Sequence, residues 1–269
     1  MKIGSREFDR TGKTYLMGIL NVTPDSFSDG GNYNQLDNAL FRAEEMIRQG
    51  TDLLDIGGES TRPGYTRLSD EEEICRVVPV IRAVRERFEI PVSVDTYKGN
   101  VAEAAVQAGA HMINDIWGFR HDEKIRKVAA ESGAACCLMH NRLQPEYRNF
   151  LPEVLEDLKE SIALARKAGV REDRIMLDPG VGFAKTYEQN LAVIRHLEEL
   201  QTLGFPVLLA ASRKSLIGQT LDLPVDQRLE GTLALTVMAV LKGCSFVRVH
   251  DIVENKRVIQ MTEAVLAGG

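Results

Sequence analysis

Short apolar runs alternate with longer amphipathic segments along the chain. Eight runs have the length and β-branched content of buried strands, at residues 15–20, 53–56, 92–94, 112–114, 135–139, 174–177, 207–210 and 246–249. Apolar residues at helical spacing follow nearly every run, which predicts parallel strands joined by crossover helices. Eight such units in 269 residues fit a single closed (β/α)8 TIM barrel better than an open sheet.

Helix boundaries support this alternation. Ser69 and Glu72 predict a capping box ahead of an apolar helix face, and Gly50 and Gly109 stand where two helices are expected to end. Pro79 predicts a kink or a split in its helix. The residues before Tyr15 suggest a hairpin over the floor of the barrel. We therefore expect one domain over residues 1–269.

Composition narrows the functional class. The formal net charge of −6 argues against a nucleic-acid partner. The first apolar run is too short to span a membrane and lacks a cleavage site, so we expect a cytoplasmic protein with no membrane association. The four cysteines show neither a zinc spacing nor a Cys-x-x-Cys motif, and we expect them to be reduced and structural.

Polar residues end all eight runs. The first run ends at Asn21 in a loop rich in Pro, Asp, Ser and Gly, residues that an ordinary turn also prefers. In a closed barrel the carboxyl ends of the strands meet at one rim, where active sites lie. Eight polar strand ends at one rim predict a deep polar pocket there.

One group of rim residues suits a flat heterocycle. A carboxylate can accept two parallel hydrogen bonds from an N–C–N edge, while an amide both donates and accepts. The residues are Asp95, Asn114, Asp178 and Lys214, with Ile116, Met139 and Phe183 as candidate apolar faces for the ring. An ion pair at the rim would equally explain each carboxylate taken singly.

A second group of rim residues predicts an anion site. Arg62, Arg248 and His250 are cationic or can become so, Thr61 lies beside Arg62, and Arg binds phosphate oxygens with two parallel bonds. Asn21 can ligate a hard cation such as Mg²⁺. Ser215 is expected to begin a helix whose N–H groups can receive an anion. For His250 alone, a structural hydrogen bond explains the residue as well as a ligand contact.

Several long strings, taken together, resemble the bacterial dihydropteroate synthases. The strings are residues 21–31 (NVTPDSFSDGG), 55–64 (DIGGESTRPG), 95–98 (DTYK), 114–118 (NDIWG), 139–140 (MH), 178–186 (DPGVGFAKT), 212–215 (SRKS) and 248–251 (RVHD). They span residues 17–251 in the order of that family. The resemblance implies a (β/α)8 enzyme that condenses 6-hydroxymethyl-7,8-dihydropterin diphosphate with p-aminobenzoate, releasing diphosphate in folate synthesis.

The resemblance also implies roles for single residues. It places the pterin on Asp95, Asn114, Ile116, Met139, Asp178, Phe183, Lys214 and Arg248. It places the diphosphate on Asn21, Thr61, Arg62, Arg248 and His250, with Mg²⁺ at Asn21, and p-aminobenzoate on Phe27, Thr61, Pro63, Lys214 and Ser215. The implied catalytic set is Asn21, Arg62, Asp95, Lys214, Arg248 and His250. Sulfonamides would compete with p-aminobenzoate, and a homodimer would form through the apolar segments after Leu229.

Two other functions remain open at this stage. A folate-dependent methyltransferase barrel has a similar pterin pocket but does not need the Arg62 loop or the string at residues 212–215. A catalytically silent paralogue would bind pterin without chemistry. Formation of dihydropteroate distinguishes the three possibilities.

Overall fold

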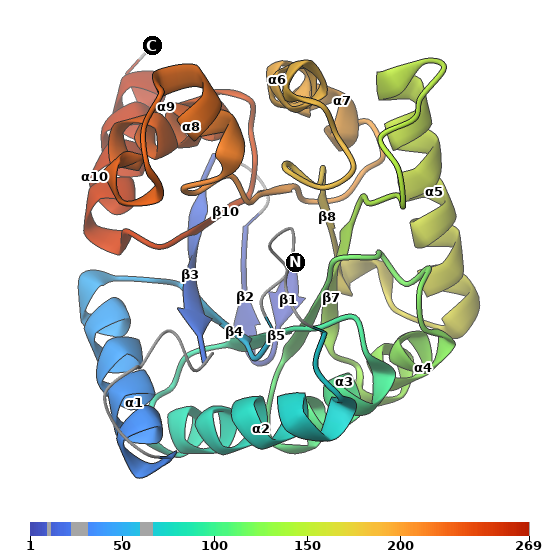
Figure 1. Ribbon diagram of the computed structural model, residues 1–269, viewed down its shortest axis with the longest axis vertical. Coiled ribbons are helices and arrows are strands. Elements are labelled where there is room, and N and C mark those ends of the chain that lie inside the picture. Colours follow the sequence, from blue (N-terminus) through green and yellow to red (C-terminus); the bar gives the residue numbers. More distant parts are fainter. Residues whose placement is uncertain (10–11, 23–31, 60–66, 269) are drawn as a thin grey trace.

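A barrel of parallel strands forms the centre of the molecule (Figure 1). The computed structural model describes residues 1–9, 12–22, 32–59 and 67–268. Within them the barrel strands are β3 (Tyr15–Asn21), β4 (Leu53–Gly57), β5 (Val92–Asp95), β6 (Met112–Asp115), β7 (Ala135–Met139), β8 (Ile175–Asp178), β9 (Leu208–Leu209) and β10 (Phe246–Val249). They follow the order β8-β7-β6-β5-β4-β3-β10-β9, and an isolated bridge between Leu177 and Val207 joins the two edges. The predicted barrel is confirmed.

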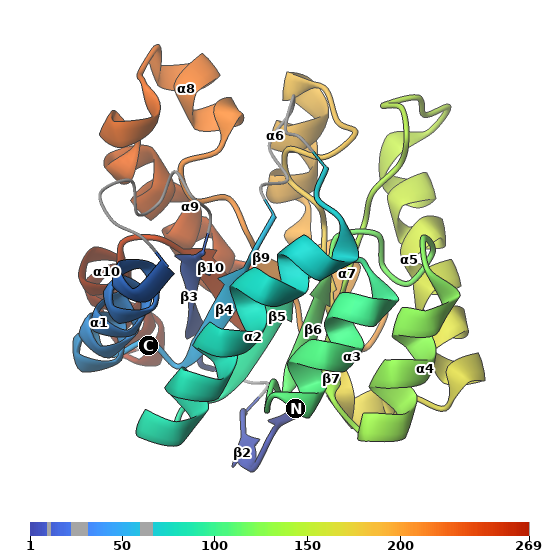
Figure 2. The same ribbon diagram turned by 60° about the horizontal axis from the view of Figure 1, so that its bottom comes forward.

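Helices surround this ring on the outside (Figures 1 and 2). They are α1 (Asn32–Gln49), α2 (Asp70–Arg87), α3 (Gly99–Gln107), α4 (Glu123–Ser132), α5 (Phe150–Ala168), α6 (Tyr187–Arg195), α7 (Leu197–Gln201), α8 (Ser215–Leu221), α9 (Leu229–Leu241) and α10 (Ile252–Ala267), with 3-10 turns η2 (Glu172–Arg174) and η3 (Val225–Gln227). None of the described helices is long and apolar enough to cross a membrane.

Most predicted boundaries are confirmed. Ser69 Oγ accepts a bond of 3.2 Å from the Glu72 N–H, and Glu72 Oε2 accepts one of 2.9 Å from the Ser69 N–H, which is the predicted capping box. Gly50 and Gly109 adopt φ values of 94° and 108° after α1 and α3. Helix α2 continues through Pro79, so this proline does not split it.

Two predicted strands have different bounds in the structure: β8 is shifted by one residue and β9 is shorter. Arg174 is the last residue of η2 and not the first residue of β8, because its N–H donates to the Arg171 carbonyl at 3.0 Å. Strand β9 keeps only Leu208 and Leu209. Pro206, just before, has no N–H for a ladder, and Val207 pairs with β8 only as an isolated bridge.

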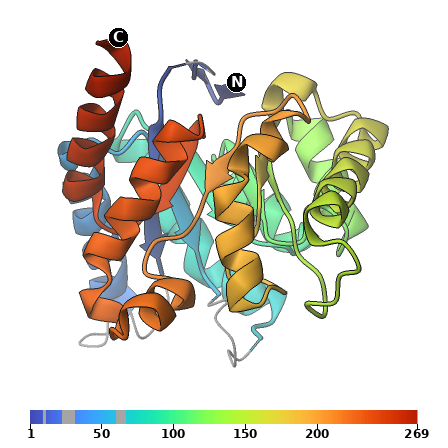
Figure 3. The same ribbon diagram turned by 90° about the horizontal axis from the view of Figure 1, so that it is seen from above.

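The N-terminal hairpin plugs the floor of the barrel. Strands β1 (Lys2–Ile3) and β2 (Arg6–Glu7) pair antiparallel, and Figures 2 and 3 show them at one end of the ring, on the side where α10 ends. Met1, Ile3 and Phe8 are buried against inward-facing strand residues, which are Met17, Leu53, Met112, Ala135, Cys137, Met176, Leu208 and Phe246. The hairpin predicted from the sequence is confirmed.

Side chains along a strand alternate between the outer face, against the helices, and the barrel interior. Two residues after Met112 comes Asn114, two after Met176 comes Asp178, and two after Phe246 comes Arg248. On these three strands the interior therefore changes from an apolar floor to a polar upper layer within two residues. This change defines the base of a pocket at the carboxyl ends of the strands.

Candidate active site

Strand register brings four rim positions into one row. Asn21 pairs with Gly57, Gly57 with Asp95, and Asp95 with Asn114. A Cβ at Gly57 would lie 3.7 Å from Asn21 Oδ1 and 3.5 Å from Asp95 Cβ. Glycine at this position therefore leaves space between the amide and the carboxylate.

A buried ion-pair group forms the base of the pocket. Arg248 Nε donates to Asp55 Oδ2 at 2.6 Å, and Arg248 Nη2 donates to Asp95 Oδ2 at 2.6 Å. Asn114 Nδ2 donates to the same Asp55 oxygen at 3.1 Å. The guanidinium thus holds Asp95 in a fixed orientation and leaves its other carboxylate oxygen, Oδ1, for a ligand.

Burial shifts the protonation equilibria of this group. It raises the pKa of Asp95 to about 7, while the charge of Arg248 acts in the opposite direction. The two carboxylates in turn hold the Arg248 pKa above its ordinary range. Asp95 therefore changes charge near neutral pH. Protonation removes a hydrogen-bond acceptor, so ligand binding by this carboxylate is sensitive to pH in that range.

Lys214 connects the opposite side of the pocket. It follows β9 as the N-cap residue of α8, and its Nζ donates to the Val181 carbonyl and lies 4.9 Å from the centre of the Phe183 ring. Burial lowers the pKa of Lys214 to about 8, against the charges of Asp178 and Asp95. Asp178 is 2% exposed, and burial raises its pKa. The ammonium and the carboxylates therefore share one site, as the sequence predicted.

Apolar side chains form a wall beside these groups. Tyr97, Ile116 and Met139 are buried in one cluster, and Trp117 and Phe183 pack against it. Ile116, Met139 and Phe183 were the residues expected to cover the faces of a flat ring, and the structure brings all three together. An apolar wall beside hydrogen-bonding groups suits a planar heterocycle.

The anion group is only partly within the described residues. Ser212 Oγ accepts from the His250 N–H at 3.3 Å and lies 3.0 Å from His250 Nδ1, which fixes the orientation of the imidazole. Ser215 is exposed and begins α8, as predicted. The remaining candidates, Phe27, Thr61, Arg62 and Pro63, lie outside the described residues.

A magnesium site is consistent with the residues at this rim. Within the described ranges, no three His, Cys, Asp or Glu residues gather as a metal cage. Asn21 offers an amide oxygen at the end of β3. Mg²⁺ usually takes one or two protein oxygens and completes its shell with water and substrate phosphates. A single amide ligand beside an anion site fits that pattern.

Reasoning from the sequence missed a buried ion cluster beside the rim. Lys98 Nζ lies 2.7 Å from Glu59 Oε2, 2.7 Å from Glu73 Oε2 and 2.9 Å from the Leu68 carbonyl. Glu59 Oε2 also accepts from the Leu68 N–H at 2.8 Å. Lys98 therefore joins the residue before segment 60–66 to a residue just after it.

Asp55 was also missed as a site residue. Its side chain is acidic and yet 0% exposed. Its position in the apolar run 53–56 was the available signal, because a carboxylate inside a buried strand needs a cationic partner. That partner, Arg248, lies 193 residues away in the sequence.

The chain matches the family model described as "Pterin binding enzyme" over residues 17–250. It is 57% identical over 267 residues to a protein of Clostridium beijerinckii named dihydropteroate synthase, with 99% of each chain covered. It superposes on a dihydropteroate synthase from Clostridium difficile, crystallised with pteroic acid, with a TM-score of 0.94 and 48% identity, covering 96% of this chain and 99% of the other. For the Yersinia pestis synthase, solved as a sulfonamide drug complex, these values are 0.92 and 39%, covering 100% and 99%.

Proposed function

The chain belongs to the dihydropteroate synthase family of pterin-binding enzymes, and from this we propose how its residues divide the work. The enzyme condenses 6-hydroxymethyl-7,8-dihydropterin diphosphate with p-aminobenzoate, giving 7,8-dihydropteroate and diphosphate in folate biosynthesis. The observation that carries the residue assignment is the pairing of Arg248 with Asp55 and Asp95 at the rim that also carries the apolar wall.

We place the pterin between the apolar wall and the buried carboxylates. Asp95 and Asp178 accept from its amino and ring N–H groups, while Asn114 and Lys214 bond its remaining polar edge. Ile116, Met139 and Phe183 cover its faces. Arg248 was also expected to bind the diphosphate. Its guanidinium pairs with two carboxylates, those of Asp55 and Asp95. This pairing supports a role in orienting Asp95 toward the pterin more directly than a role in binding the diphosphate.

The diphosphate and p-aminobenzoate sites extend to the outer rim. We assign the diphosphate to Asn21, His250, Thr61 and Arg62, and the aminobenzoate to Phe27, Thr61, Pro63, Lys214 and Ser215. Asn21 would hold Mg²⁺, which supplies positive charge to the leaving diphosphate when it is bound. Because sulfonamides resemble the aminobenzoate, we expect them to compete for its site. The Yersinia pestis complex supports this expectation.

We propose that diphosphate leaves before the amine attacks. His250 and Arg62 stabilise the charge that grows on the leaving group. The carbon that remains is a cation in conjugation with the pterin ring, and Asp95 and Asp178, at the hydrogen-bonding edge of that ring, offset its charge. An aromatic amine is nucleophilic at neutral pH, so this mechanism needs no general base on the protein.

We also propose a homodimer through the last helices. Helices α9 and α10 pack against each other, and four of their large apolar side chains are more than half exposed: Leu241 58%, Met261 65%, Val265 65% and Leu266 55%. Sedimentation of the protein and of a Met261→Lys, Val265→Lys variant tests this proposal. A monomer in both cases would contradict it. The cytoplasmic location stays a prediction.

Turnover with the pterin diphosphate, p-aminobenzoate and Mg²⁺ tests the chemistry, with diphosphate and dihydropteroate followed together. Equal release of both products is expected. Pterin binding without product would point to a silent paralogue or to a folate-dependent methyltransferase. Removing Mg²⁺ with a chelator should weaken binding of the diphosphate ester and leave free 6-hydroxymethylpterin nearly unaffected. An equal loss for both ligands would contradict a metal beside the diphosphate.

A further inference from the structure

The turn after β8 adopts an unusual backbone conformation. Gly180, Gly182 and Ala184 have φ values of 70°, 83° and 42°, in the left-handed region that disfavours a residue with a side chain. A Cβ on Gly180 would lie 1.9 Å from the His140 carbonyl oxygen. The turn from 180 to 184 is therefore pressed closely against the end of β7 and needs contacts that hold it there.

The inner side of this turn contacts the pocket. The Val181 carbonyl accepts a hydrogen bond from Lys214, and the Phe183 ring lies under the same ammonium group. The position of Lys214, which reaches over from α8, thus depends on where the turn places one carbonyl and one ring.

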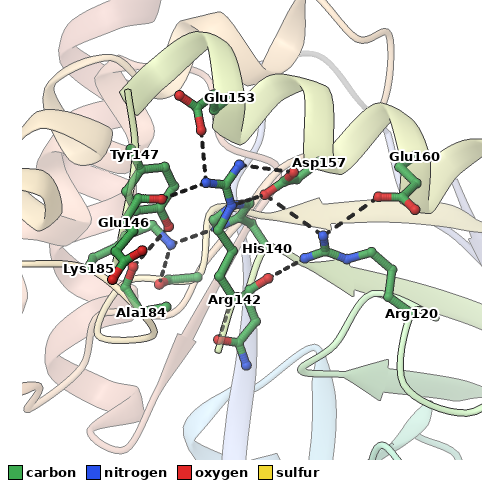
Figure 4. A network of polar contacts seen from close by, with 12 residues as sticks. Arg120, His140, Arg142, Glu146, Tyr147, Glu153, Asp157, Glu160, Ala184 and Lys185 are labelled. Carbon is green, nitrogen blue, oxygen red and sulfur yellow. Dashed lines mark hydrogen bonds and ion pairs between the residues drawn. The ribbon is translucent and has the colours of Figure 1, made fainter. Parts of the chain in front are cut away.

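Lys185 holds the outer side of the turn (Figure 4). Its Nζ lies 3.0 Å from the Gly180 carbonyl, 3.1 Å from the Phe183 carbonyl and 2.8 Å from His140 Nδ1. An ammonium has three N–H groups and no acceptor. Three acceptors at these distances match a charged Lys185 that donates to each of them, while burial lowers its pKa to about 7 against the charge of Asp178.

His140 and Asp157 determine this arrangement. Asp157 Oδ2 lies 3.0 Å from His140 Nε2 and accepts from Arg142 Nε at 2.6 Å, which keeps the carboxylate charged. Burial lowers the pKa of His140 to about 4, so its ring is neutral and carries one proton. The carboxylate draws that proton to Nε2, and Nδ1 is left as the acceptor for Lys185.

We propose that Lys185, oriented by His140 and Asp157, is a positioning residue for the pterin site. It clamps the 180–184 turn from outside, and through the Val181 carbonyl and the Phe183 ring it sets the location of Lys214. Neither Lys185 nor Asp157 touches the reacting atoms in this account. The inference rests on the proposed role of Lys214 in binding the pterin.

The test measures affinity for 6-hydroxymethylpterin by calorimetry and by quenching of Trp117, the chain's single tryptophan, which packs against the same apolar cluster as Phe183. Lys185→Met should weaken pterin binding by about tenfold to a hundredfold, because a misplaced group costs factors of that size. Lys185→Arg, which keeps donors to the two carbonyls, should recover part of the loss. Lys159→Met removes an exposed lysine whose ammonium pairs with Glu156, and it should leave pterin affinity unchanged.

Asp157→Asn provides a second, milder test if Lys185→Met does not fold. Nitrogen-15 spectra of histidine should show the His140 proton on Nε2 in the parent protein and a shift toward Nδ1 in this variant, with weaker pterin binding. A shifted proton with unchanged affinity would overturn the proposal.

Lys214→Met separates this inference from the proposed function. If Lys214→Met loses pterin binding and Lys185→Met retains it, the clamp is wrong and the pterin site stands. If both variants bind pterin as the parent does, the assignment of Lys214 is wrong, and the inference falls with it.

Discussion

Replacing Lys98 with methionine should destabilise the protein strongly. Methionine keeps most of the apolar stem and removes the ammonium from between Glu59 and Glu73. The side chains of all three residues are at most 5% exposed. Removing one partner of a buried ion pair costs about 3–5 kcal/mol, because the remaining charge is left unpaired. Here two carboxylates lose the same partner, so we expect the unfolding free energy to fall by at least that amount.

The size of the effect can be measured by thermal and urea unfolding. In a chain of this size, 1 kcal/mol shifts the melting temperature by about 2–4 °C, so the expected drop is roughly 6–20 °C. Burial already raises the pKa of Glu73 in the parent protein. Without Lys98 the Glu73 carboxylate takes up a proton more readily, so the destabilisation should be largest at alkaline pH and shrink as the pH falls toward 5.

Lys127→Met is the matched control. Its ammonium lies 3.7 Å from Glu123 on an exposed helix surface, and such pairs contribute about 0.5 kcal/mol or less. A loss for Lys98→Met no larger than for Lys127→Met would refute the reasoning. A loss that does not depend on pH would show that the stability comes from packing of the stem and not from the charges.

Three other predictions follow from the geometry. Pterin affinity measured by calorimetry should fall as the pH drops below about 7, because burial raises the Asp95 pKa to that value and protonation removes an acceptor; a flat profile would exclude Asp95 as the binding carboxylate. Gly180→Ala should cost clearly more unfolding free energy than the about 1 kcal/mol of left-handed strain expected for Gly133→Ala, whose added Cβ meets nothing within 4 Å; equal losses would contradict the close approach to β7. In the native protein only Cys75 of the four cysteines is exposed and should react quickly with a thiol reagent, and a second fast thiol would contradict the burial of the others.

Strand and helix positions could be predicted because they depend on local patterns. Each barrel strand is a short apolar run bounded by Gly, Pro or polar residues, and the Ser69 capping box is visible in four consecutive residues. The errors at Arg174 and Val207 arose where a 3-10 turn and a proline change hydrogen bonding without changing hydrophobicity.

The site was predictable only in part, because its contacts cross the barrel. Asp95 and Asp178 each stand at the end of an apolar run, so their position at the rim could be predicted from the local pattern. The bond from Arg248 to Asp55 joins residues 193 positions apart, and no local pattern predicts it. Lys185 stood in a recognisable string, but its contacts to two backbone carbonyls depend on the left-handed turn before it. No periodicity in the sequence encodes that turn.

The seam between β8 and β9 gives the barrel a side that differs mechanically from the rest. Elsewhere neighbouring strands share ladders of several residue pairs or a pair of registered residues, and here the sheet is held by the isolated Leu177–Val207 bridge and by the Leu177 N–H on the Pro206 carbonyl. Asp178 is the last residue of β8, on one side of this seam, and Lys214 follows β9, on the other side.

A pterin bound to both Asp178 and Lys214 would connect the two sides of the β8–β9 seam, where the barrel has the fewest strand-to-strand hydrogen bonds. Substrate binding would then stiffen the enzyme as well as fill its pocket, and product release would return the barrel to its looser state. Ordering the β8–β9 seam would cost conformational entropy, and this cost would lower the net affinity for the pterin. A variant with a longer β9 ladder would hold its ligand more tightly and release its product more slowly.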